Sequence, residues 1–243
     1  MIYASSRKGK HHNVNEDTIV IGTEILSDSS GSFEIPDNGF ICIADGVGGN
    51  EGGDKASHFV AQELSEWNGR SKDSIKEFLT QINNNLIEAS VTDVNARDRA
   101  TTLTGFFVNG SAFKVIHIGN TRAFIRQGKY LKQITSDHTT YNWLVRSGQT
   151  EAAESANRSE ITNCFGGIDA ALLSKLYIAD CQEFSLALLT SDGVHDYLSL
   201  DELEEIISDV SSYSDKCETI IQKAIDAGSE DDISVVIVCP MEG

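Results

Sequence analysis

Four aspartates stand where a short apolar run of the sequence meets a polar loop: Asp17, Asp45, Asp192 and Asp231. Such runs are typical of buried strands, and a buried strand holds a side chain at its end rigidly. If the four strand ends converge, each close pair of carboxylates repels by up to about 4 kcal/mol at an effective dielectric constant near 20. Bound cations or large pKa shifts would relieve that repulsion, whereas acids scattered over a surface would need neither.

The types of residue around these carboxylates favour a hard cation. Oxygen-only ligation points to Mg²⁺ or Mn²⁺, and zinc is disfavoured because no His/Cys cluster with metal-ligand spacing accompanies the aspartates. The five cysteines are widely scattered and contain no Cys-x-x-Cys pair. We interpret them as reduced packing residues of a cytoplasmic protein.

The segment 41–49 is the strongest single candidate for chemistry. An apolar run ends in Asp45, and three glycines follow within four residues: Gly46, Gly48 and Gly49. Bare glycine backbone lets a ligand approach main-chain N–H and C=O groups closely. A helical pattern begins shortly afterwards and places a positive helix N-terminus near this loop. A tight strand-to-helix turn capped by the aspartate is the simpler alternative for the segment taken alone.

Hydrophobic periodicity gives the elements that position these residues. Helices are expected up to about residue 67, over 72–89, over 199–210 and over 215–227, and the third opens with a capping box at 199–202. Strands are expected at 1–5, 18–21, 40–44, 184–190 and 233–239, with a meander over 106–134 that contains an Asn109–Gly110 hairpin turn. Residues 22–38 are expected to form a loop or irregular hairpin, and Trp143 is expected to lie in the core. Strands in two blocks with paired helices indicate two antiparallel sheets with helices outside them, an α+β fold.

Length and charge limit the function. The 243 residues suit one domain over 1–243 with a sizeable core, and no apolar run reaches membrane-spanning length. We expect no secretory leader, because the first residues lack its basic-then-apolar layout. A formal charge of −18 argues against binding of nucleic acid or an anionic membrane surface. The same charge opposes binding of a phosphate group unless cations intervene.

Eight short motifs in order cover nearly the whole chain: S-x-x-G-x-x-H-x-x-N-E-D at 6–17, A-D-G-V-G-G at 44–49, T-T at 101–102, G-N-T-R at 119–122, I-T-S-D-H-T at 134–139, L-V-x-x-G with I-T and G at 144–166, S-D-G at 191–193 and D-D-I-S at 231–234. Together they resemble the metal-dependent serine/threonine protein phosphatases of type 2C in their compact bacterial form. Each motif is weak alone, but the full series in this order is specific.

The resemblance implies a four-layer α-β-β-α sandwich, with two antiparallel sheets flanked by helix pairs and a flap segment at about 139–180. It implies two Mg²⁺ or Mn²⁺ ions, with Asp45 bridging both and Asp192 and Asp231 completing one site. The Gly46 carbonyl and Asp17, directly or through water, would serve the other. A water activated by the two ions would attack the phosphorus of a phosphoserine or phosphothreonine protein in line. A cytoplasmic monomer is expected.

His12 departs from the family pattern, because an arginine that grips the phosphate usually stands there. Neutral histidine cannot make bidentate guanidinium contacts. One hypothesis is that His12 donates a hydrogen bond to the phosphate or protonates the leaving alkoxide. The alternative is an ordinary loop histidine, with Lys8 or Lys10 supplying the charge.

Further departures concern the periphery of the site. Asn120 replaces an aspartate that helps to hold a third, weaker metal, so a site near Asn120 and Asp196 is expected to be weak or absent. Asp196 could instead cap a helix. Val47 stands where eukaryotic members often carry a histidine, Asp232 replaces an asparagine, and Asn163 replaces an arginine. A catalytically weakened module that binds phosphoproteins is therefore the alternative function, and another two-metal hydrolase such as a phosphodiesterase is a third.

Overall fold

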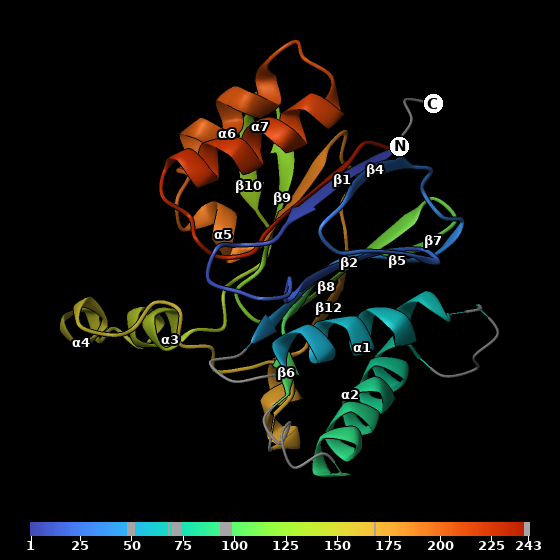
Figure 1. Cartoon of the computed structure of the whole chain (residues 1–243), viewed down its shortest axis with the longest axis vertical. Coiled ribbons are helices and arrows are strands. Elements are labelled where there is room, and N and C mark those ends of the chain that lie inside the picture. Colours follow the sequence, from blue (N-terminus) through green and yellow to red (C-terminus); the bar gives the residue numbers. More distant parts are fainter. Residues whose placement is uncertain (48–51, 68, 70–73, 93–98, 168, 241–243) are drawn as a thin grey trace.

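The computed structural model describes residues 1–47, 52–67, 69, 74–92, 99–167 and 169–240, and within them two antiparallel sheets pack face to face (Figure 1). The first sheet has the order β10-β9-β13-β14-β1-β4. Its strands are β1 (Ile2–Arg7), β4 (Ser30–Phe33), β9 (Arg122–Gln127), β10 (Tyr130–Gln133), β13 (Ala187–Thr190) and β14 (Ile233–Val238). The strand that comes last in the chain therefore lies in the middle of this sheet, between β13 and β1.

The second sheet has the order β11-β6-β5-β7-β8-β12, with β2 also paired to β5 and β3 to β2. Its strands are β2 (Asp17–Ile21), β3 (Glu24–Leu26), β5 (Asn38–Val47), β6 (Ala100–Thr101), β7 (Leu103–Asn109), β8 (Ala112–Ile118), β11 (Phe165–Gly166) and β12 (Tyr177–Asp180). The Asn109–Gly110 turn joins β7 to β8 as expected, with Asn109 opposite Ala112.

Alternation along the central strands builds three apolar layers. In β5, Ile41 and Ile43 face the other sheet, whereas Phe40 and Cys42 face the outer helices. In β14, Val236 and Val238 likewise enter the central layer, and the residues between them pack on helices. Because side chains of a strand point alternately to its two faces, strands that are apolar throughout must be covered on both sides.

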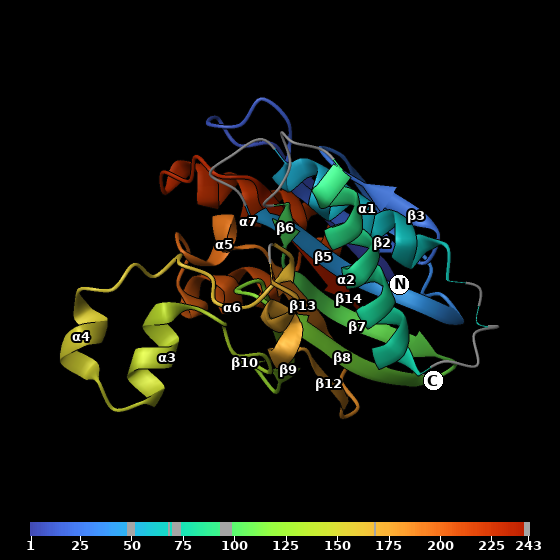
Figure 2. The same cartoon turned by 90° about the horizontal axis from the view of Figure 1, so that it is seen from below.

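A helix pair covers each outer face, so the expected four-layer α+β sandwich is confirmed (Figure 1), and the view from below looks onto one of these pairs (Figure 2). Helices α1 (Gly53–Ser65) and α2 (Ile75–Thr92) pack on the second sheet. Helices α6 (Leu200–Ser208) and α7 (Tyr213–Asp226) pack on the first, beside the short α5 (Asp192–His195). The expected capping box at the start of α6 is present, with Ser199 and Glu202 bonded reciprocally. Among the described helices, none has the length and apolar character to cross a membrane.

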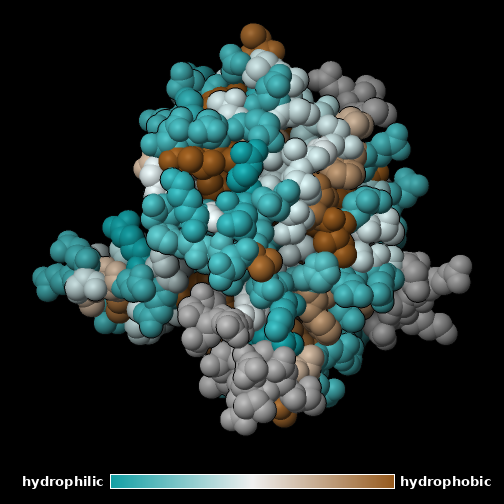
Figure 3. Space-filling view, in the orientation of Figure 1, coloured by the Kyte–Doolittle hydropathy of each residue, from teal (hydrophilic) through white to brown (hydrophobic). Residues whose placement is uncertain are grey.

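An arm projects from the body between the two sheets (Figure 1). It consists of α3 (Thr140–Arg146) and α4 (Thr150–Glu154), and an isolated bridge between Thr139 and Ile161 closes its base. The chain then returns through β11, the 3₁₀ helix η1 (Ala170–Lys175) and β12. On the face seen in Figure 3 the arm is mostly hydrophilic. We call the segment 139–180 the flap.

Three expectations from the sequence were wrong. Residues 22–38 contain the strands β3 and β4, because the second sheet offers an edge to one and β1 offers an edge to the other. Trp143 is 59% exposed on the flap, since α3 has no sheet beneath it to pack on. The strand of Asp45 continues through Val47, because β6 pairs with Gly46 and Val47.

The pairing of β5 with β7 generates a stability prediction. A Cβ added at Gly105 would lie 2.0 Å from the Ile41 carbonyl oxygen, so a side chain there must separate the two central strands. We expect Gly105→Ala to lower the free energy of unfolding by about 3 kcal/mol or more, as overpacked cores do. Gly128→Ala is the control: that site is open, and its φ of 65° makes the expected loss about 1–2 kcal/mol. Denaturant unfolding measures both, and equal losses would contradict the prediction.

Candidate metal centre and active site

Asp17 and Asp45 are brought together by the pairing of β2 with β5. The two residues are direct partners in this antiparallel ladder, at the end of the sandwich where β2 begins. Asp192 opens α5 immediately after β13, and Asp231 precedes β14 in the other sheet. The four carboxylates that the sequence singled out therefore meet at one end of the sandwich, with two contributed by each sheet.

The backbone of Asp45 is held on both sides by two threonines. Its N–H donates to Thr102 Oγ1 (3.1 Å), and its carbonyl accepts from the Thr102 N–H (2.8 Å) and from Thr101 Oγ1 (2.8 Å). Thr102 Oγ1 is in turn 2.8 Å from Thr121 Oγ1. These bonds fix the main chain at Asp45 and therefore the point from which its carboxylate extends toward its neighbours.

A second polar chain holds Asp17 and crosses between the sheets. Asn15 Oδ1 accepts from the Asp17 N–H (2.9 Å), and Asn15 Nδ2 donates to Ser6 Oγ (2.9 Å). Ser6 also accepts from Ser234 Oγ (2.9 Å), its partner in the β1–β14 ladder. The Asp17 side chain is 1% exposed. The position of the carboxylate is therefore set by strands of both sheets.

Burial and mutual repulsion both raise the pKa values of these carboxyl groups. Burial raises the pKa of Asp45 well above its usual value, and the charges of Asp192 and Asp17 add to the effect. Burial and Asp232 raise the pKa of Asp17 in the same way, although the hydroxyls of Ser234 and Ser191 oppose the shift. Burial together with Asp231 and Asp196 raises the pKa of Asp192 to about 7.

Buried oxygens at this place are left without a donor. Within the described residues, Asp17 Oδ2 and Asp45 Oδ2 have no hydrogen-bond partner although both atoms are fully covered. Buried carboxylate oxygens without partners are costly, and paired acids of this kind are compensated by protons or by metal ions. The donor set consists of hard oxygens, which fits Mg²⁺ or Mn²⁺.

Asn120 faces Asp192 from the turn between β8 and β9. Its Nδ2 donates to Asp192 Oδ2 (2.8 Å), and this bond lowers the pKa that burial and charge have raised. Asn120 Oδ1 is buried and has no partner among the described residues. An aspartate at this place would repel Asp192 instead of bonding it. Asp196 is exposed and ends α5, while Ser199 caps α6, so a helix-entry cap at Asp196 is wrong.

Gly46 is packed too tightly to carry a side chain. A Cβ there would lie 2.5 Å from the backbone of Gly53, at the start of α1, so the expected approach of the loop to a helix N-terminus is present. The Gly46 N–H donates to the Glu16 carbonyl (3.0 Å). Metal ligation by the Gly46 carbonyl stays a prediction. Gly48 and Gly49 lie outside the described residues.

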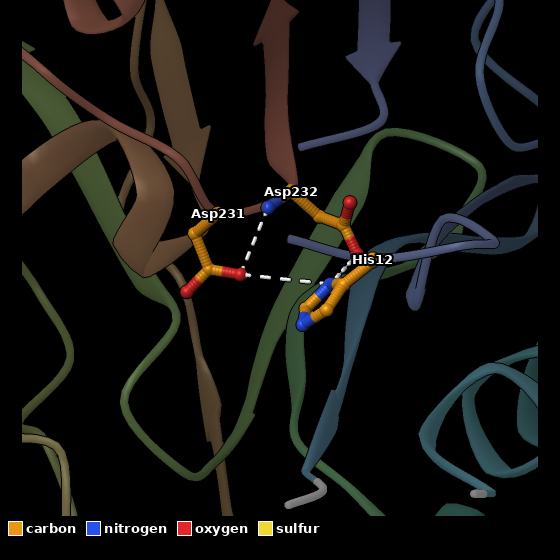
Figure 4. A group of neighbouring side chains, drawn as sticks. All are labelled: His12, Asp231 and Asp232. Carbon is orange, nitrogen blue, oxygen red and sulfur yellow. Dashed lines mark hydrogen bonds and ion pairs between the residues drawn. The ribbon is translucent and has the colours of Figure 1, made fainter. Parts of the chain in front are cut away.

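His12 lies beside the acidic end of β14 (Figure 4). Its Nδ1 is 2.7 Å from Asp232 Oδ2 and 3.9 Å from Asp231 Oδ1. Burial lowers the pKa of His12, but the hydrogen bond to Asp232 and the surrounding carboxylates outweigh burial, so the pKa is raised. The other ring nitrogen faces away from Asp232 (Figure 4).

These three residues have the spacing of a metal site, but their hydrogen bonds favour a different role. Asp232 Oδ1 accepts from the Gly9 N–H (2.7 Å), and Oδ2 accepts from the Glu16 N–H (2.6 Å) as well as bonding His12. Its own N–H donates to Asp231 Oδ1 (2.8 Å). Asp232 thus ties the 8–16 loop to β14, and a cation there would have to displace protein donors.

Sequence reasoning missed the organising role of Asp232. The side chain is 3% exposed and bonds residues more than 200 positions away, a relation that no local pattern contains. A doublet of aspartates directly before an apolar strand was the available signal. Lys8 Nζ bonds the carbonyls of Gly9 and His12 (3.0 and 2.7 Å), so it helps to hold the loop, whereas Lys10 is exposed.

Comparisons with known proteins agree with this geometry. The family model described as Protein phosphatase 2C matches residues 23–227, a span that includes Asp45 and Asp192 but not His12, Asp17 or Asp231. The serine/threonine phosphatase stp of Listeria monocytogenes (serotype 4b) is 27% identical over 223 residues, 87% of this chain and 88% of that protein. Protein phosphatase PhpP of Streptococcus pneumoniae is 29% identical, with 82% and 84% covered. The crystal structure of PstP/Ppp from Mycobacterium tuberculosis superimposes with a TM-score of 0.81 at 22% identity, covering 100% of this chain and 99% of that one.

The raised pKa of Asp192 predicts how pH affects stability without metal. Between the usual aspartate pKa of about 3.9 and about 7 the folded protein binds more protons than the unfolded chain. The free energy of unfolding therefore falls as pH rises through this window, by a few kcal/mol. We expect thermal unfolding in EDTA to show this fall, and Asp192→Asn to make it smaller without abolishing it, because Asp17 and Asp45 still contribute. Asp37→Asn, at an exposed turn, is the control. A slope that is identical in all three proteins would contradict the assignment.

Proposed function

The chain belongs to the protein phosphatase 2C family and is a protein serine/threonine phosphatase, and we propose that two Mg²⁺ or Mn²⁺ ions at the Asp17–Asp45 pair support its catalysis. The observation that carries this proposal is a pair of buried oxygens on neighbouring strands, Asp17 Oδ2 and Asp45 Oδ2, which have no partner among the described residues. The substrates would be proteins phosphorylated on serine or threonine, as the names of the relatives indicate.

The residues divide into two groups around the proposed ions. Asp45 would contact both ions, with Asp192 and Asp231 on one side and Asp17 and the Gly46 carbonyl on the other. When bound, the ions supply positive charge and a water of lowered pKa. The chain itself contributes rigidity, because Thr101 and Thr102 fix the Asp45 backbone and the Asn15–Ser6 link fixes Asp17.

Charge is the second part of the proposal. A protein of formal charge −18 with four converging carboxylates repels a phosphate dianion, and bound divalent cations reverse the local sign. Because Asn120 contributes an uncharged amide next to Asp192, a third metal site near Asn120 and Asp196 would be weak.

We further propose that residues 1–243 act as one catalytic domain with its flap at 139–180, as a cytoplasmic monomer.

His12 would contact the substrate phosphate. The bond between its Nδ1 and Asp232 fixes the orientation of the ring and leaves the other nitrogen to donate one hydrogen bond outward (Figure 4). A histidine held by a carboxylate resembles an arginine in carrying a directed N–H donor, but it offers one contact where arginine offers two. We place His12 with Asp17 and Asp45 as the residues nearest the chemistry.

Neutralising Asp45 tests metal dependence directly. We expect hydrolysis of p-nitrophenyl phosphate and of a phosphothreonine peptide to require Mn²⁺ and to stop in EDTA. Asp45→Asn should lower kcat by about a hundredfold or more, because it changes a proposed ligand and not an outer partner. Asp37→Asn is the matched control at an exposed site. Metal-dependent binding of the peptide without turnover in the unaltered protein would instead favour the phosphoprotein-binding module.

Replacing His12 tests the phosphate contact. Losing one hydrogen bond to a charged group costs about 1.5–3 kcal/mol, so His12→Ala should lower kcat/KM for the phosphopeptide by about ten- to a hundredfold. His11→Ala is the control, since His11 is the adjacent exposed histidine and pairs with Glu230. Steady-state kinetics with melting curves for each variant separate function from folding. If His12→Ala left kcat and KM unchanged, His12 would be an ordinary loop residue.

A further inference from the structure

His138 lies at the junction of the flap and the turn that carries Asn120. Its main-chain N–H donates to the Gly119 carbonyl (2.7 Å), and its ring Nδ1 accepts from the Gly119 N–H (3.2 Å). One residue therefore bonds both polar groups of Gly119. A backbone–backbone bond alone would leave the turn free to tilt, but the second bond from the ring fixes its orientation.

We propose that the His138 side chain is a positioning residue that couples the base of the flap to the Gly119–Asn120 turn and, through it, to Asp192. The inference rests on the proposed metal-dependent function, because Asp192 matters here as a ligand. It concerns a side chain that contacts neither the proposed ions nor the substrate.

The turn reaches two of the proposed ligands. Asn120 Nδ2 donates to Asp192 Oδ2 (2.8 Å), so the orientation of the turn sets the direction of this carboxylate. Gly119, with φ of 108°, also lies against Thr102: an added Cβ would be 2.5 Å from Thr102 Cβ. Thr102 holds the backbone of Asp45. A tilt of the turn would therefore displace both Asp192 and Asp45.

On its other side His138 is attached to the flap. Its carbonyl accepts from the Thr162 N–H (2.8 Å), where the flap returns to the body. The next residue, Thr139, bridges Ile161 and caps α3 by accepting from the Asn142 N–H (3.2 Å). Both ends of the flap base thus bond to His138 or to the residue next to it, so His138 joins the flap directly to the turn.

The His138 ring is held in the neutral tautomer that can accept a hydrogen bond at Nδ1. Nδ1 can accept from Gly119 only when the imidazole is neutral and carries its proton on Nε2. The His117 ring lies against it, with 4.8 Å between ring centroids and 41° between the ring planes, and His117 is itself fixed by Thr104 Oγ1 (2.8 Å) and the Ser136 carbonyl (3.0 Å). Burial lowers the pKa of His138, with Arg146 acting in the same direction, and this keeps the ring neutral near pH 7.

Two substitutions separate positioning from packing. His138→Leu removes the acceptor but fills the space, whereas His138→Asn offers Oδ1 at nearly the reach of Nδ1. We expect His138→Leu to raise the dissociation constant for Mn²⁺, measured by calorimetry without substrate, by about tenfold, as lost outer partners do. His138→Asn should stay within about twofold of the unaltered protein. If the Leu variant does not fold, His138→Gln, whose acceptor lies one bond farther out, replaces it.

Metal-free measurements keep this proposal separate from the proposed function. In EDTA, hydrogen exchange at the Gly119 amide should speed up in His138→Leu and not in His138→Asn. With Trp67→Phe as background, Trp143 is the only tryptophan left, and its fluorescence anisotropy should fall in the Leu variant as the flap loosens. His58→Leu, at an exposed position of α1, is the control.

The outcomes are distinct. Gly119 exchange and Trp143 anisotropy that are unchanged in His138→Leu would overturn the coupling, as would equal losses in the Leu and Asn variants. If the unaltered protein bound no Mn²⁺, the proposed function would fail, while the exchange and anisotropy data would still decide whether His138 links the flap to the turn.

Discussion

The repulsion between Asp17 and Asp45 is the constraint around which this end of the molecule is organised. Pairing of β2 with β5 places Asp17 and Asp45 directly opposite each other, and their backbones cannot separate without breaking this ladder. Thr101, Thr102 and Asn15 then remove the remaining freedom of the backbone. Such an arrangement destabilises the fold at neutral pH unless protons or cations compensate it. The fold therefore loses stability at the place where the proposed function requires Asp17 and Asp45 to be charged and fixed in position.

Much of the fold could be read from the sequence because the signals are local and repeated. The apolar runs of β5 and β14, the Asn109–Gly110 turn and the capping box at Ser199 each follow from a few neighbouring residues. The position of the acids could be anticipated for the same reason, since each stands beside an apolar run. Relations across the chain could not be anticipated: the bonds of Asp232 to Gly9 and Glu16 join its two ends. Exposure of Trp143 depends on the absence of a partner layer beneath α3, which composition does not encode.

Two departures from the family pattern prove to be neighbours in space. Considered separately, His12 and Asp232 look like independent substitutions in distant motifs, but they form one hydrogen-bonded pair. An asparagine at 232 would offer one acceptor oxygen where Asp232 uses two, for Gly9 on one side and for His12 and Glu16 on the other. The charge of Asp232 also favours a histidine over a shorter neutral residue at 12. His12 and Asp232 are therefore best understood as one coupled pair of substitutions.

The place of β14 in its sheet affects how the protein folds during synthesis. This strand lies between β13 and β1, so the sheet has a gap at its middle until the final stretch of the sequence is available. On a ribosome, β1 could pair with β4 early but would wait through more than two hundred residues for its other neighbour, β14. Asp231 and Asp232 arrive with that last strand, so a nascent chain cannot assemble the acidic cluster early. Completion of the acidic cluster is thereby tied by topology to completion of the sheet.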